Sequence, residues 1–138
     1  MTEMKPFTLE PRMLTLRGVF YPTGYMILMF PTAQDARDAE RKLRGAGYDS
    51  EAVSLLTPTD IQGQVAHTVG NADIPLPSAG TEADTVRHFA RLASQGHHAL
   101  MIHAPSAEES THVMSVLHDA PISYGQKYRN LVIEDLVE

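Results

Sequence analysis

The sequence contains the same passage twice, and this internal repeat constrains the fold more than any other feature. Residues 24–43 read GYMILMFPTAQDARDAERKL, and residues 97–117 read HHALMIHAPSAEESTHVMSVL. Superimposing the two passages pairs Pro31 with Pro105. Each copy is an apolar run of strand length, then a proline, then a Ser/Thr-x-x-Asp/Glu pattern that is typical of the first turn of a helix. The chain therefore contains two strand-to-helix units of the same design.

Each unit continues into a second strand. The first helix ends at the glycines of GAG, residues 45–47, and EAVSLLT at 51–57 is the returning strand. In the second unit, PISYGQKY at 121–128 reads as a turn and RNLVIEDLV at 129–137 as the final strand. Two strand–helix–strand units predict an α+β fold of the ferredoxin-like type (a split βαβ repeat), with a four-stranded antiparallel sheet and both repeat helices on one face.

We expect a single domain over residues 1–138, because a chain of 138 residues buries enough surface to stabilise one core. An extra helix is inserted between the two repeats. The expected parts are an N-terminal arm at 1–23, a first βαβ repeat at 24–57, a Gly- and Pro-rich loop at 58–80, the inserted helix at 81–96 and a second βαβ repeat at 97–138.

Composition and charge narrow the class of protein. The chain is 43% hydrophobic and 20% charged, which is typical of a globular protein rather than a disordered one. A net charge of -6 disfavours binding to nucleic acid or to anionic membranes. The longest apolar run, Tyr25–Phe30, is far shorter than the roughly 20 residues of a membrane-spanning helix. The absence of cysteine fits a reducing compartment, so we expect a cytoplasmic protein.

The seven histidines raise the question of a metal site. His97, His98 and His103 are the densest group, but a strand directs His98 to the face opposite the other two. No His-x-x-x-His pair is present, nor is a P-loop or a G-x-S-x-G motif. The sequence therefore predicts no metal site, no cofactor and no catalytic residue that a motif identifies.

The two central strands are apolar on both sides. One face should meet the repeat helices and consists of Met26, Leu28, Phe30, Leu100, Ile102 and Ala104. The other face consists of Tyr25, Ile27, Met29, Ala99, Met101 and His103. Soluble monomers seldom expose a contiguous apolar patch of more than roughly a few hundred Å², so another part of the protein or a second subunit must cover the second face. We predict that a homodimer does much of this, with the arm or inserted helix contributing; a lid formed by the chain itself is the alternative.

Three further stretches resemble a known family. GYDSEAVSLLTP at 47–58, GHHALMIHAPSAEES at 96–110 and YRNLVIEDL at 128–136 resemble the small bacterial general-stress-protein domain, also called the heat-induced stress protein domain. The resemblance covers about residues 24–57 and 81–137. It implies a stress-associated cytoplasmic bacterial protein, and it assigns no catalytic residues.

Three functions follow as hypotheses. The first is a non-enzymatic interaction or binding domain with a small-molecule or protein partner. The second is a small-ligand-sensing regulatory domain, and the third is an enzyme that uses His103 with a tyrosine or arginine of the C-terminal segment. Any ligand site should lie at the margin of the second sheet face, where the candidate residues are Tyr25, Met29, Met101, His103, Tyr124, Tyr128 and Arg129.

Overall fold

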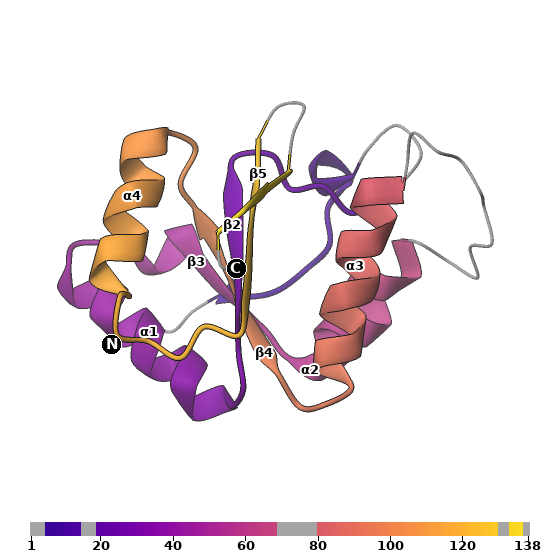
Figure 1. Ribbon diagram of the computed structural model, residues 1–138, viewed down its shortest axis with the longest axis horizontal. Coiled ribbons are helices and arrows are strands. Elements are labelled where there is room, and N and C mark those ends of the chain that lie inside the picture. Colours follow the sequence, from indigo (N-terminus) through magenta and orange to yellow (C-terminus); the bar gives the residue numbers. More distant parts are fainter. Residues whose placement is uncertain (1–4, 15–18, 69–79, 130–132, 137–138) are drawn as a thin grey trace.

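The computed structural model describes residues 5–14, 19–68, 80–129 and 133–136, which form an α+β protein with a sheet between two layers of helices (Figure 1). The sheet has the order β1-β3-β4-β2-β5-β6. Its strands are β1 (Lys5–Pro6), β2 (Tyr25–Phe30), β3 (Val53–Leu56), β4 (His98–His103), β5 (Tyr124–Tyr128) and β6 (Ile133–Asp135). The main helices are α1 (Ala33–Gly45), α3 (Gly80–Ala93) and α4 (Ala107–Val116), and short turns of 3-10 helix lie at Pro11–Met13 and Ser50–Ala52.

Each adjacent pair in the order β3-β4-β2-β5 is antiparallel, which confirms the predicted four-stranded antiparallel sheet. The two copies of the repeat provide its adjacent central strands, and Leu28 of β2 faces Leu100 of β4 in the ladder. Strand β1 adds to one edge in parallel with β3, and β6 adds to the other edge antiparallel to β5. The addition of β1 was not predicted from the sequence.

The prediction for the last strand of the sheet was wrong in position. Residues 124–128, read as a turn, form β5, which pairs with β2 from Met26↔Lys127 to Met29↔Tyr124. The stretch 129–137, read as the final strand, contains only the short strand β6 within the described residues. Glycine and glutamine lower strand propensity, but pairing with a long central strand overrides that local preference.

The repeat helices begin and pack as the repeat predicts. The Thr32 hydroxyl accepts from the Asp35 amide at 3.0 Å, and Ser106 and Glu109 form a capping box at the start of α4. Both helices cover one face of the sheet (Figure 1). All six strand residues predicted to meet them are buried there. We call the whole buried cluster the repeat-helix core: Met26, Leu28, Phe30, Ala36, Ala39, Leu43, Val53, Leu100, Ile102, Ala104, Val113 and Leu117.

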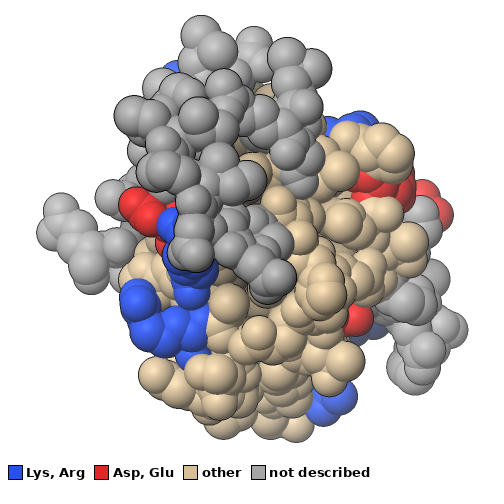
Figure 2. Space-filling model, turned by 90° about the vertical axis from the view of Figure 1, so that its right-hand side faces the viewer, with Lys and Arg blue, Asp and Glu red and all other residues tan. Residues whose placement is uncertain are grey.

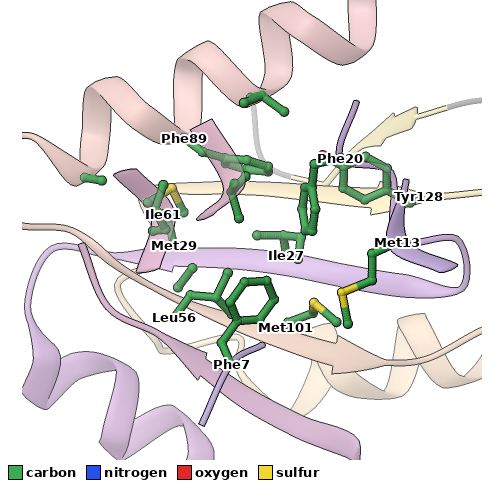
Figure 3. Packing of buried hydrophobic residues seen from close by; sticks show 14 of the residues in the cluster. Phe7, Met13, Phe20, Ile27, Met29, Leu56, Ile61, Phe89, Met101 and Tyr128 are labelled. Carbon is green, nitrogen blue, oxygen red and sulfur yellow. The ribbon is translucent and has the colours of Figure 1, made fainter. Parts of the chain in front are cut away.

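The opposite face is covered by other parts of the same chain. Helix α3, residues 58–68 and the N-terminal segment pack on it, and Figure 3 shows Phe89, Ile61 and Phe20 gathered over Ile27 and Met29 of β2. We call this the insertion core: Phe7, Met13, Val19, Phe20, Ile27, Met29, Leu56, Ile61, Val65, Val86, Phe89, Ala93, Ala99, Met101 and Tyr128. The second face is therefore covered by a lid that the chain itself forms, which was the alternative to the expected dimer. The homodimer itself stays a prediction.

The segment predicted as a loop at 58–80 is helical in its first half. It forms α2 (Pro58–Asp60), a π-helical turn at Ile61–Val65 and a 3-10 turn at Ala66–Thr68. Thr57 caps it reciprocally with Asp60, and proline fits the first position of a helix. The breakers that predicted a loop are therefore compatible with a short helix, because Ile61 and Val65 are buried. Residues 69–79 lie outside the described part of the chain.

Within the residues that the structure describes, no helix combines the length and the apolar character needed to cross a membrane.

Helix α3 spans Gly80–Ala93, close to the predicted 81–96. It belongs to the insertion core through Val86 and Phe89.

Phe20 connects the N-terminal segment to the insertion core through aromatic contacts, and its removal tests that packing. Phe20 is fully buried, and its ring makes edge contacts with Phe7 at 6.4 Å and Tyr128 at 6.0 Å between centroids. We expect Phe20→Ala to lower the free energy of unfolding in urea by about 3–5 kcal/mol, because it leaves a cavity in a packed core. The exposed Thr23→Ala should change it by less than about 0.5 kcal/mol. A loss below about 1 kcal/mol for Phe20→Ala would contradict the packing.

Candidate ligand-binding site

The structure brings together two of the residues predicted to form a site. Tyr25 and His103 are paired across β2 and β4, and their ring centroids lie 4.9 Å apart. The Arg12 guanidinium donates to the Tyr25 hydroxyl at 3.2 Å and to Glu10 at 2.8 Å, and these hydrogen bonds raise the pKa of Arg12. The Tyr25 hydroxyl is thus hydrogen-bonded to the N-terminal segment.

The other predicted site residues are elsewhere. Met29 and Met101 are buried in the insertion core. Tyr128 is also buried there, and its ring makes an edge contact with Tyr21 at 4.9 Å. Tyr124 stacks on His88 of α3 with ring centroids 3.8 Å apart. The structure therefore does not assemble the expected group around Tyr25 and His103.

Arg129, the remaining predicted residue, lines a cavity of about 240 Å³ on the opposite side of the sheet from Tyr25. The cavity lies between the first turns of α4, the end of β5 and the C-terminal segment. Its lining residues are Pro105, Ala107, Ser110, Thr111, Met114, Lys127, Arg129 and Leu136. Only Arg129 of this set was predicted.

Lys127 is the unusual member of the lining. Its side chain is only 3% exposed, although lysine is seldom fully buried unless it is paired. Its ammonium donates to the Ser106 carbonyl oxygen at 3.0 Å and to the Ser110 hydroxyl. Both acceptors belong to the start of α4, so these bonds connect β5 to that helix.

The strand register explains how a lysine comes to be buried. Lys127 is opposite Met26 of β2, and Met26 is part of the repeat-helix core. Alternate residues of a strand share a face, so Lys127 and Arg129 lie on the side of α4 while Tyr128 lies on the side of α3. The sequence signal was the alternation of YGQKY, which reading the segment as a turn concealed.

Gly24 holds the two ends of the cavity wall together. Its amide donates to the Tyr128 carbonyl at 2.8 Å, and its carbonyl accepts from the Ala104 amide at 3.0 Å. Its φ of +86° is one that other residues rarely adopt. Pro105 and Arg129, which follow those two partners in sequence, are therefore positioned on either side of the first residue of the repeat.

The electrostatics of the cavity favour a negative charge. An ammonium has three N–H donors, and the described partners of Lys127 accept two of them. The cavity also borders Pro105 and Ala107 at the N-terminal end of α4, which carries the positive end of the helix dipole, and Arg129 adds a second cation. Strand β6 places Glu134 opposite Lys127 in the ladder, so one acidic residue occupies a neighbouring register position.

A second hollow offers less to a ligand. It is a surface groove of about 450 Å³ between α1 and the residues that follow α4, lined by Asp35, Asp38, Ala39, Arg41, Lys42, Ala120 and Pro121. Its charges are mixed, and Arg41 and Asp38 pair with one another at the surface.

The outer surface over α2 and α3 offers no charged site of this kind among the described residues. Figure 2 shows mostly uncharged side chains on this face, with Lys and Arg gathered toward one edge. The exposed arginines of α3 are Arg87 and Arg91, and Arg87 pairs with Asp84 at 2.9 Å. Across the described ranges, no group of three or more His, Cys, Asp or Glu side chains is arranged to hold a metal ion.

Comparisons of the chain with protein-family models, with curated proteins and with solved structures found no match.

The stack of His88 on Tyr124 predicts a pH dependence of stability. Burial and then the charge of Arg91 lower the pKa of His88. The unfolded chain therefore binds a proton at a higher pH than the folded chain, so unfolding becomes easier as the pH falls through the ordinary histidine value of about 6.5. His88→Phe keeps a stacking ring but removes this titration.

We expect the stability of the wild-type protein, relative to His88→Phe, to fall between about pH 8 and about pH 5 in urea titrations. Parallel curves for wild type and His88→Phe would contradict the lowered pKa of His88.

Proposed function

We propose that the protein is a non-enzymatic binding domain of ferredoxin-like topology that holds a small anionic ligand in the cavity beside Lys127. The observation that carries this proposal is a lysine with 3% exposure at the wall of a cavity of about 240 Å³. A buried cation costs free energy unless it is paired, and a bound anion provides such a pair.

The topology supports the ferredoxin-like part of the proposal. The order β3-β4-β2-β5, with α1 and α4 each connecting two of these strands on one face, is the arrangement that a split βαβ repeat requires. The resemblance to the general-stress-protein domain supports a stress-associated cytoplasmic role. If the protein is instead a small-ligand-sensing regulatory domain, the second hypothesis, then the event that it senses is the binding of an anion in this cavity.

The hydrogen bonds around Ser110 favour binding over catalysis. A serine beside a lysine is also the arrangement of a nucleophile and its base. Here, however, the Ser110 hydroxyl accepts from Lys127 and donates to a backbone carbonyl ahead of α4, that of Ser106 at 3.1 Å or that of Ala104 at 3.3 Å. A nucleophile needs its hydroxyl proton directed to a base, so these bonds support a structural role for Ser110.

Thermal unfolding with a panel of small anions tests the proposal. We expect at least one of acetate, butyrate, phosphate and sulfate to raise the Tm in a dose-dependent way at constant ionic strength, because a ligand of the folded state stabilises it by mass action. Lys127→Met should abolish the increase. Lys42→Met, the same substitution at an exposed lysine of α1, should preserve it.

The result would overturn the proposal if none of the anions raised the Tm, or if Lys127→Met responded to them as the wild type does. Circular dichroism of both variants serves as the control for folding. Replacing a buried charged group by an apolar side chain of similar length is often tolerated, so Lys127→Met should fold.

A further inference from the structure

We infer that the ligand is a small monocarboxylate with a short apolar chain. This inference rests on the proposed function and adds the chemical class of the ligand. It comes from two features of the cavity that are independent of one another, namely the chemistry of its walls and the amount of charge it can neutralise.

The walls are mostly apolar. Pro105, Ala107, Met114 and Leu136 contribute carbon and sulfur surface, and Met114 and Leu136 pack against the repeat-helix core. A volume of about 240 Å³ is below the usual range of about 300–1,000 Å³ for drug-sized ligands. The site therefore suits a molecule of a few carbon atoms, with its apolar part against Met114 and Leu136.

The polar end of the cavity matches a carboxylate. The Arg129 guanidinium is a planar fork that binds carboxylates with two parallel hydrogen bonds, while Lys127 acts as a point charge. Serving both cations takes two oxygens, which a carboxylate has. A neutral ligand of the same shape would leave the Lys127 charge without an added partner.

Nearby acidic residues limit the charge of the ligand. Glu109 forms the capping box of α4 with Ser106, and Glu108 is in the same first turn. These carboxylates repel a phosphate dianion more strongly than a singly charged carboxylate, and apolar walls desolvate a phosphate without replacing its hydrogen bonds.

Titrations followed by NMR of the methionine methyl groups test this inference on the intact chain. The probes are sodium acetate, butyrate and phosphate, with butyramide as the uncharged analogue, all at constant ionic strength. Butyrate should shift the Met114 methyl signal while the core residue Met29 stays unchanged. Each buried methylene group contributes about 0.8 kcal/mol, so butyrate should bind on the order of tenfold more tightly than acetate. Butyramide and phosphate should bind more weakly than butyrate.

Variants assign the polar contacts. Lys127→Met should abolish butyrate binding, and Arg129→Gln should weaken it by about tenfold, the size of one charged hydrogen bond. Lys42→Met is the matched control and should bind like the wild type.

The outcomes separate this inference from the proposed function. If phosphate binds more tightly than butyrate and Lys127→Met abolishes its binding, the ligand class is wrong and the anion site stands. If butyramide binds as well as butyrate, the charge argument is wrong. If no probe shifts Met114, or the shifts persist in Lys127→Met, both the inference and the proposed function fail.

Discussion

The structure depends on one constraint, which is that the central strands β2 and β4 are apolar on both faces. Residues 26, 28 and 30 of β2 point to α1 and α4, and residues 27 and 29 point to α3. A strand of this kind must be covered twice, and the two repeat helices can cover only one side. The inserted helical segment and the N-terminal segment cover the other, so parts that looked like additions to a repeat fold complete its core.

The repeat made the centre of the fold predictable from the sequence. The apolar runs, the Thr32 and Ser106 caps and the two-faced assignment all rest on local periodicity, and the structure has each of them. Strand β5 and the helical turns at 58–68 were missed because their conformation depends on tertiary contacts. Tyr124–Tyr128 is a strand because β2 is beside it, and Ile61 and Val65 are helical where they reach the insertion core.

The candidate site was missed for the same reason. The sequence predicted a site at the part-polar second face of the sheet. In the structure, the insertion core fills that face with Phe20, Phe89 and Tyr128. The cavity beside Lys127 depends on β5 being a strand, because only strand alternation turns Lys127 toward α4. Arg129 was predicted as a site residue, but with His103 rather than with Lys127. Burial of a charge is set by the register of strands far apart in sequence, which local patterns do not contain.

Native-state hydrogen exchange is the most direct measurement of whether one chain closes both faces. If α3 completes the core, its slowest amides and those of β2 and β4 should converge with increasing denaturant on one free energy, that of global unfolding, because they open together. Exchange of the α3 amides through an opening more than about 2 kcal/mol cheaper, with β2 and β4 still protected, would show that the second face opens independently and would contradict the account.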